Sequence, residues 1–224
     1  MDLRSTQMSG RRRVGAVAAI GVLALGLAAA WVWRAVNLTP ASPPRYVEVG
    51  RGAYTLPRPD PIADFALLRH DGKPFGNGAL TGQWTFLIFG YTFCPDFCPT
   101  TLAMFSQMHG LLAQQPERVR DVQFAMVTLD PERDTAELLA AYVPQFNPAF
   151  IGVTGSRTMV QRLADSVGAD HQRHAPNSHG HYLIDHSTSV LLVNPQGRVQ
   201  GVFAPPHDAT DMVKAFAKIR QSAP

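Results

Sequence analysis

The amino-acid sequence predicts an α/β domain, with helices on both faces of a central mixed sheet, preceded by one N-terminal transmembrane helix. The domain is predicted because short apolar stretches, typical of buried strands, alternate with longer stretches of helical periodicity. Two strand-like stretches around the turn sequence NPQG then precede a last amphipathic helix. The transmembrane helix is predicted because a long run without charged residues follows three arginines near the N-terminus.

The N-terminal segment has the pattern of a membrane anchor. Residues 1–13 are basic, and the run Val14–Trp33 contains no charged residue over 33 − 14 + 1 = 20 positions. This length matches the roughly 20 apolar residues that a helix needs to cross a bilayer. Trp31 and Trp33 stand at its far end, where aromatic side chains favour the membrane interface. The arginines are expected in the cytoplasm, with the rest of the chain outside.

A cleaved signal peptide is the alternative, because Ala28–Ala30 forms a small-residue cleavage site. The apolar run is longer than the roughly 7–15 residues of a typical signal core, which favours an uncleaved anchor. Residues 1–13 leave little room for a mitochondrial transit peptide. We therefore expect a single-pass protein of the bacterial inner membrane, with its C-terminal domain facing the periplasm.

Charge gives no support for a nucleic-acid partner. The chain has 20 Lys and Arg and 17 Asp and Glu residues. Five of the basic residues and one acidic residue lie at or before residue 34, which leaves 15 − 16 = −1 for the rest. The exported part therefore has no basic excess, and no nucleic acid is expected to bind. Residues 34–61 are rich in proline and predict an extended tether, and residues 62–224 have the length of one domain.

The elements of this domain are predicted in order from local patterns. Apolar stretches predict strands, and apolar positions three or four apart after a capping residue predict helices. In chain order, we expect a strand at 84–91, a helix from Pro99 to about residue 115, a strand at 122–129, a helix at 130–143, a strand at 149–155, a helix at 156–168, strands at 187–193 and 198–203, and a helix at 207–220.

Three stretches far apart in the sequence are expected to meet at one edge of this sheet. A right-handed crossover makes the first two strands parallel, so their carboxyl ends share an edge. Cys94 follows the first of these strands, and Asp130 follows the second. If the strand at 187–193 runs antiparallel to them, His186 arrives at the same edge.

Both cysteines of the chain lie in the segment CPDFC, which predicts reactive thiols. Pro99 is favoured at the first position of a helix, which puts Cys98 at the N-cap, whereas Pro95 keeps Cys94 in the preceding loop. The positive end of the helix dipole lowers a thiol pKa into the range of roughly 3.5–7.5. We expect a redox-active pair that can form an intramolecular disulfide.

A purely structural disulfide is the less favoured interpretation. Closing so short a loop contributes only about 2 kcal/mol, against about 4.7 kcal/mol for a 100-residue loop. Redox exchange and metal binding remain. Two thiolates and an imidazole suit copper or zinc, and spacing does not choose between these metals. The imidazole could come from any histidine of the segment Asp170–His186, namely His171, His174, His179, His181 or His186.

Three motifs together show a resemblance to a known family over about residues 60–222. FGYTFCPDFCPTTL at 89–102, VTLDPERDT at 127–135 and DHSTSVLLVNPQGRV at 185–199 resemble, in order and spacing, the motifs of the Sco/SenC family. Proteins of that family are membrane-anchored and copper-binding, have a thioredoxin-like fold, and serve assembly of the CuA centre of cytochrome c oxidase. The resemblance implies a thioredoxin-like domain in which the helix after Cys98 is the active-site helix.

The resemblance also implies the ligands and the cofactor. Cys94, Cys98 and His186 are expected to bind copper, both as Cu(I) and as Cu(II). Asp130 is expected to cap the following helix rather than to be a ligand. Asp185 could orient His186 by a hydrogen bond, or it could simply be a polar residue at the entry to a strand. The other histidines of the histidine-rich segment are not part of the motif, and we expect them in a solvated loop.

Two functions fit these residues. The first is a copper metallochaperone that delivers copper to the CuA site of cytochrome c oxidase subunit II. The second is a thiol–disulfide oxidoreductase that reduces the cysteines of that site or of another exported target, with Cys94 and Cys98 as its catalytic pair. A periplasmic copper donor or thiol reductant is a further expected partner. The three residues between the cysteines, where thioredoxins have two, and the lack of proline at 184–189 favour the metal.

Overall fold

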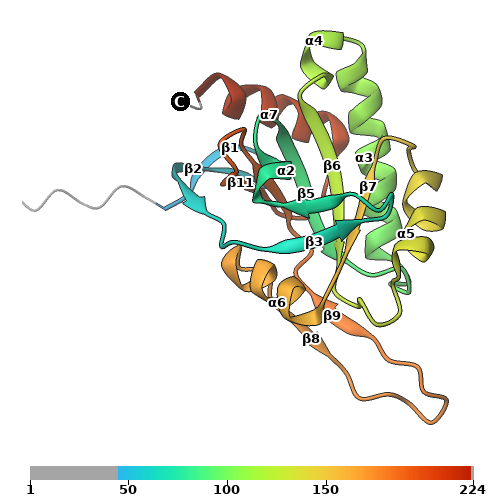
Figure 1. Ribbon diagram of the computed structural model, residues 1–224. Coiled ribbons are helices and arrows are strands. Elements are labelled where there is room, and N and C mark those ends of the chain that lie inside the picture. The colour runs from blue at the N-terminus through green and yellow to red at the C-terminus, as the bar shows by residue number, and fades with distance from the viewer. Residues whose placement is uncertain (1–44, 223–224) are drawn as a thin grey trace, which may run out of the picture. The chain divides into compact units, whose positions relative to one another are not determined.

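A nine-stranded mixed sheet runs through residues 45–222, the part of the chain that the computed structural model describes (Figure 1). The strand order is β1-β2-β11-β10-β5-β6-β7-β3-β4. The strands of this sheet are β1 (Val47–Gly50), β2 (Ala53–Pro61), β3 (Ala66–Arg69), β4 (Pro74–Gly76), β5 (Trp84–Gly90), β6 (Val122–Thr128), β7 (Ile151–Thr154), β10 (Val190–Val193) and β11 (Arg198–Phe203).

Helices cover both faces of the sheet, as the sequence predicts (Figure 1). Side chains alternate between the two faces along a strand, so Phe86 and Leu87 of β5 belong to different hydrophobic cores. Helix α3 (Phe97–Ala113) and helix α7 (Ala209–Ser222) pack on the core that holds Phe86, and helix α6 (Arg157–Ser166) packs on the core that holds Leu87. The helices are α2 (Asn77–Leu80), α3 (Phe97–Ala113), α4 (Pro116–Val119), α5 (Ala136–Tyr142), the 3₁₀ helix η1 (Val143–Gln145), α6 (Arg157–Ser166) and α7 (Ala209–Ser222).

Strand directions bring three distant segments to one edge of the sheet. β5 and β6 are parallel, and Gly90 is paired with Thr128 where the two strands end. β10 runs antiparallel to β5, with Leu191 opposite Leu87, so the residues before β10 arrive at that edge. They come from a projecting two-stranded hairpin, β8 (His171–Arg173) and β9 (Ile184–His186) (Figure 1). The predicted convergence at this edge is confirmed.

The sheet extends further toward the N-terminus than the sequence predicted. Residues 47–61, assigned to the tether from their proline content, form β1 and β2, and β2 pairs with β11. The sheet therefore begins at Val47 rather than after residue 62. Pro57 and Pro59 are tolerated because they fall where the ladder between β2 and β11 is interrupted, so no ladder hydrogen bond is lost.

The helix predicted at 130–143 begins later than expected. α5 starts at Ala136, and the Thr135 side chain caps it by accepting a hydrogen bond from the N–H of Leu138 at 3.2 Å. Residues 130–135 instead form a turn after β6, at the same edge as the cysteines. This turn, rather than a helix, is what the DPERDT motif encodes.

The predicted membrane anchor, Val14–Trp33, lies outside the described residues, as does the first part of the predicted tether. Among residues 45–222, no helix combines the length and the apolar character needed to cross a membrane.

Candidate metal centre

The two cysteines lie where β5 passes into α3. Cys94 is in the connecting loop, and its N–H donates to the carbonyl of Tyr91 at 3.1 Å. α3 begins at Phe97 with Asp96 as its N-cap, so Cys98 is the second residue of the helix. The predicted N-cap position of Cys98 is therefore wrong by two residues, although the sulfur still sits in the first helical turn.

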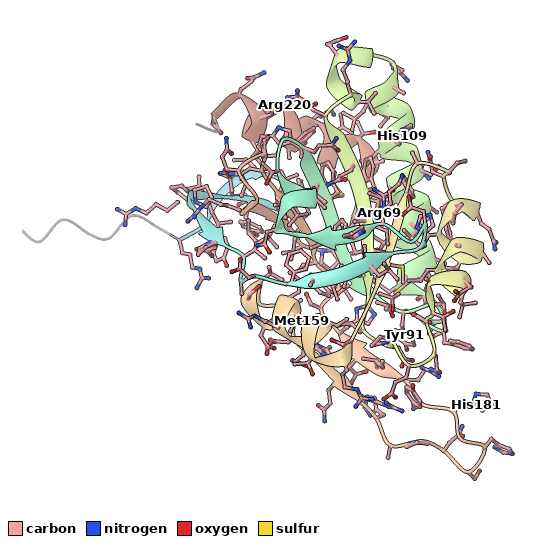
Figure 2. All side chains as sticks on the ribbon, in the orientation of Figure 1. Arg69, Tyr91, His109, Met159, His181 and Arg220 are labelled. Atoms are coloured by element: carbon pink, nitrogen blue, oxygen red, sulfur yellow. The ribbon has the colours of Figure 1, made fainter. Side chains whose placement is uncertain are left out.

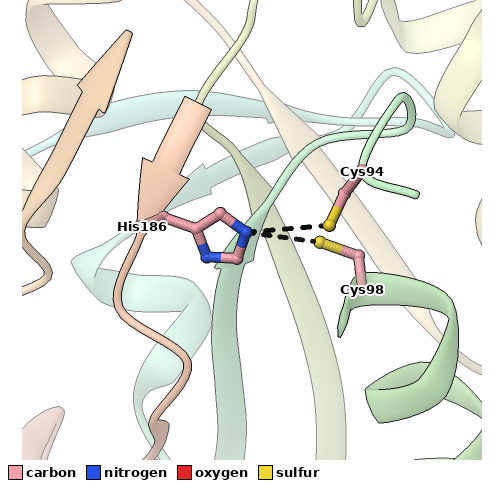
Figure 3. Close-up of side chains that lie close together, drawn as sticks. All are labelled: Cys94, Cys98 and His186. Carbon is pink, nitrogen blue, oxygen red and sulfur yellow. Dashed lines mark hydrogen bonds between the residues drawn. The ribbon is translucent and has the colours of Figure 1, made fainter. Parts of the chain in front are cut away.

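The imidazole of His186 faces both sulfur atoms (Figure 3). Its Nε2 lies 3.7 Å from the Sγ of Cys98 and 3.9 Å from the Sγ of Cys94. The three atoms lie within 4.8 Å of one another, and no other three potential metal ligands come together in this way within residues 45–222. Neither cysteine is in a disulfide. The structure thus brings together the three residues that the sequence singled out.

A backbone carbonyl fixes the orientation of the His186 ring. Its Nδ1 lies 2.9 Å from the carbonyl oxygen of Ser187, which can only accept a hydrogen bond, so in the neutral ring Nδ1 carries the proton and Nε2 has the lone pair. The ring also packs edge-on against Tyr91 and Phe97, with centroid distances of 6.0 Å and 6.1 Å. The free lone pair is therefore directed at the two sulfurs.

Of the two roles open to Asp185, the structure supports the exposed polar residue at a strand entry and not the partner of His186. Neighbouring residues of a strand point to opposite faces, so Asp185 faces away from the sulfurs. Its Oδ2 lies 2.7 Å from Nε2 of His174, and both side chains are exposed. The alternation of β9 was the signal that sequence reasoning overlooked.

Burial opposes the predicted reactivity of Cys98. Its side chain is fully buried, with 0 % exposed. Loss of hydration penalises the charged form and raises the pKa of the Cys98 thiol, the opposite of the shift expected from the helix dipole. Cys94 is only half-buried. The Cys98 proton must therefore leave when a cation binds, and the cation rather than the helix stabilises the thiolate.

Tyr91 is a site residue that the sequence did not reveal. It is 2 % exposed, and its hydroxyl accepts a hydrogen bond from the N–H of Ile184 at 3.2 Å. Burial also raises the pKa of this tyrosine, so the hydroxyl stays protonated at neutral pH. The contact joins the end of β5 to β9, two residues before His186. In the sequence, Tyr91 ends the predicted strand at 84–91 and belongs to the motif at 89–102, but neither fact indicated a contact with β9.

Asp130 has a different role from the one predicted. Thr135, and not Asp130, caps α5. Asp130 is 2 % exposed, forms an ion pair with Arg133, and accepts a hydrogen bond from the hydroxyl of Tyr182 at 2.7 Å. Its carboxylate is therefore committed to two side chains, one of which belongs to the approach to β9.

The histidine-rich hairpin contributes one side chain to the centre. His171 contacts the carbonyl of Ala169 at 3.3 Å. His181 lies exposed on the projecting hairpin (Figure 2). His179 is exposed as well, and the backbone N–H groups of both histidines donate to Oδ1 of Asn177. The expected solvated loop is confirmed for the stretch between β8 and β9.

Comparison with known proteins agrees with the motifs. The profile of the family described as SCO1/SenC matches residues 55–221. The mouse protein named SCO2 homolog, mitochondrial, is 31 % identical over 201 residues, covering 86 % of this chain and 73 % of its own length. Its human counterpart is 37 % identical over 134 residues, covering 60 % of this chain and 50 % of its own length.

Solved structures give the same result. Arabidopsis thaliana ScoI with copper bound is 31 % identical and superposes with a TM-score of 0.66, covering 71 % of this chain and 98 % of its own. Yeast Sco1 with copper bound is 26 % identical with a TM-score of 0.68, covering 74 % of this chain and 91 % of its own. The sheet, its edge and the family motifs thus lead to one assignment: this chain belongs to the SCO1/SenC family of copper-binding proteins.

Proposed function

We propose that this protein is a membrane-anchored copper metallochaperone that holds copper with Cys94, Cys98 and His186 and assists maturation of the CuA centre of cytochrome c oxidase. One observation carries the proposal: two sulfurs and one imidazole nitrogen, from segments about ninety residues apart in sequence, lie within 4.8 Å of one another. A single ion at ordinary metal–ligand distances can contact all three atoms after small side-chain movements.

The donor set fits copper better than zinc. Soft thiolates select Cu(I) as well as zinc, and imidazole also suits both metals, so the number of ligands decides between them. A structural zinc site takes four protein ligands, whereas the described residues bring three together here. Two thiolates satisfy Cu(I), and the added imidazole gives Cu(II) the nitrogen ligand that it prefers.

The unequal burial of the cysteines suggests a direction for copper transfer. Cys98 is fully buried on α3, whereas Cys94 is half-buried in the loop. An acceptor thiolate can therefore reach the copper from the side of Cys94 and displace that sulfur first. The buried Cys98 then releases the ion last and takes up a proton as its thiolate loses the cation.

The cellular setting is part of the same proposal. The uncharged run Val14–Trp33 supports a single-pass anchor in the bacterial inner membrane, with the domain in the periplasm. There the domain would receive copper from a periplasmic donor. Its acceptor is the CuA site of cytochrome c oxidase subunit II.

Thiol–disulfide reduction is the second candidate, and the observation that favours it is that both cysteines are free and close together. In that reaction the two thiols of Cys94 and Cys98 give two electrons and two protons to a target disulfide and become a disulfide themselves. A periplasmic thiol reductant would then restore the pair. His186 has no necessary part in this exchange.

Complementation separates the two functions. A strain that lacks this protein receives the full-length wild type, His186→Ala or Cys94→Ser, and the CuA absorption of its oxidase is measured at low and at added copper. The chaperone requires all three ligands, so both variants should lose CuA at low copper. If His186→Ala restores CuA as well as the wild type at low copper, the reductase is the function.

A further inference from the structure

Two carboxylates of the turn at residues 130–135 contact different parts of the metal centre. Asp134 contacts the loop that carries the cysteines, and Asp130 contacts Tyr182 in the hairpin that carries His186. We propose that Asp134 positions the loop that carries the cysteines, whereas Asp130 positions the hairpin that carries His186, acting through Tyr182. The inference rests on the proposed copper function, and it assigns to two residues of the DPERDT motif distinct effects on the two oxidation states of copper.

Asp134 is bonded to the cysteine side. Its side chain is 0 % exposed, and its carboxylate accepts hydrogen bonds from the N–H of Thr92 at 2.9 Å and from its hydroxyl at 2.5 Å. The hydroxyl of Thr128, at the end of β6, donates to the same carboxylate at 2.6 Å. Thr92 stands two residues before Cys94. The buried carboxylate therefore fixes the start of the cysteine loop to the neighbouring strand.

Asp130 is bonded to the histidine side. It accepts the hydroxyl of Tyr182 at 2.7 Å, and Tyr182 stands four residues before His186. Arg133, which pairs with Asp130, lies over the Tyr182 ring at 3.6 Å and donates to the Tyr182 carbonyl at 3.4 Å. The ring, the hydroxyl and the carbonyl of Tyr182 are thus held by the turn.

A second contact joins the turn to the same hairpin. Arg173 of β8 also lies over the Tyr182 ring, 3.7 Å from its centroid, and pairs with Glu132 at 2.7 Å. Arg133 also lies over the ring of Phe93 at 4.7 Å, which belongs to the cysteine loop. Because Arg133 touches both halves, the test uses Tyr182 and Asp134 instead.

The two halves affect copper differently because the two oxidation states need different ligands. Cu(I) needs both thiolates and depends little on the imidazole, whereas Cu(II) gains more from the imidazole. A looser hairpin should therefore weaken Cu(II) binding selectively. A looser cysteine loop should weaken both oxidation states.

Tyr182→Phe tests the histidine half, since it keeps the ring that contacts Arg133 and Arg173 and removes only the hydroxyl. Full-length protein in detergent is titrated with Cu(II), followed by the thiolate-to-copper absorption, and with Cu(I) against a competing chelator. We expect Cu(II) affinity to fall about tenfold, the size of effect that loss of a hydrogen bond to a charged group produces, with Cu(I) affinity and disulfide formation within about twofold of wild type. Tyr54→Phe, the same change on β2, is the matched control and should leave both affinities unchanged.

Asp134→Ala tests the cysteine half, with Thr92→Val as a milder variant that loses only the hydroxyl and keeps the backbone N–H. We expect both variants to weaken Cu(I) and Cu(II) by similar factors, with Asp134→Ala the stronger and Asp134→Asn, which retains an accepting oxygen for the Thr92 N–H, closer to wild type. If Asp134→Ala does not fold, Thr92→Val alone decides this half.

The outcomes distinguish this inference from the proposed function. If wild type binds no copper, the proposed function fails and this inference, which rests on it, is overturned with it. If wild type binds both ions but Tyr182→Phe lowers Cu(I) and Cu(II) equally, or matches Tyr54→Phe, the assignment of Asp130 and Tyr182 is overturned. If Thr92→Val and Asp134→Ala both bind Cu(I) as wild type does, the assignment of Asp134 is overturned.

Discussion

The sulfur of Cys98 fills the space in which a side chain at residue 90 would lie: a Cβ on Gly90 would stand 2.5 Å from Cys98 Sγ. That is closer than real Cβ atoms approach any such neighbour. Gly90 ends β5 without a positive φ, so backbone conformation does not require a glycine there. The glycine is required by the thiol that packs against it from α3.

Gly90→Ala should therefore damage the metal centre directly. The added methyl group must displace Cys98 Sγ, and overpacking of this kind costs about 1–3 kcal/mol. We expect a lower free energy of unfolding in urea and weaker binding of Cu(I) by the reduced protein. Unchanged Cu(I) affinity would contradict the placement of Cys98 against the strand.

Gly110→Ala is the matched control for this change. Gly110 lies on the exposed side of α3, and a Cβ there would meet nothing within 4 Å. Replacing a glycine inside a helix by alanine stabilises by about 0.5–1 kcal/mol. The control should therefore be slightly more stable than wild type and bind copper equally well.

The raised pKa of the buried Cys98 thiol predicts a pH dependence of stability. In the unfolded chain this thiol loses its proton near pH ~8.5, whereas in the folded, metal-free protein it keeps the proton at that pH. Above that pH the folded state binds more protons than the unfolded state, so its free energy of unfolding falls as pH rises. Below it, the contribution is fully present.

Urea unfolding of the reduced, metal-free protein between pH 7 and pH 10 measures this effect. The loss of stability above about pH 8.5 should be smaller in Cys98→Ala, which lacks the titrating group. Equal slopes in the two proteins would show that the Cys98 thiol is not shifted. At pH 7, the half-buried Cys94 should also be alkylated before Cys98.

Asp185→Asn should leave copper binding unchanged. The side chain of Asp185 pairs with exposed His174 and does not contact His186, whose Nδ1 is held by the backbone of Ser187. We expect Cu(II) affinity within about twofold of wild type, because exposed ion pairs contribute little. A tenfold loss would restore the role that the sequence suggested for Asp185.

Much of the fold followed from the sequence because it depends on local patterns and on strand direction. The same patterns put both cysteines at one edge of the sheet, whereas the choice of His186 among five histidines came from the resemblance to the Sco/SenC family. Because β5 and β6 are parallel, Cys94 lies at the edge where both strands end. His186 reaches the same edge because β10 runs antiparallel to β5. Strand β2 was not predicted, because its proline content is typical of a tether. The interruption of the ladder at Pro57, which makes the prolines compatible with a strand, is visible only in the structure.

Side-chain burial could not be predicted in the same way. The helix dipole and the burial of Cys98 act in opposite directions on its pKa, and only the packing around the sulfur decides between them. Likewise, the DPERDT segment reads as a good helix start. Its carboxylates instead bond to Tyr182 and Thr92, which are distant in sequence.

The absorption of the Cu(II)-loaded protein in His186→Ala tests the central claim most directly. Full-length wild type, His186→Ala and the control His174→Ala, which changes a histidine of the same hairpin, are reduced, loaded with one equivalent of Cu(II) and compared in the thiolate-to-copper absorption region. We predict that wild type and His174→Ala show the band, and that His186→Ala loses it while its Cu(I) binding is only weakened, because both thiols remain. If His186→Ala shows the band of the wild type at full strength, His186 is not a copper ligand and the proposed centre is contradicted.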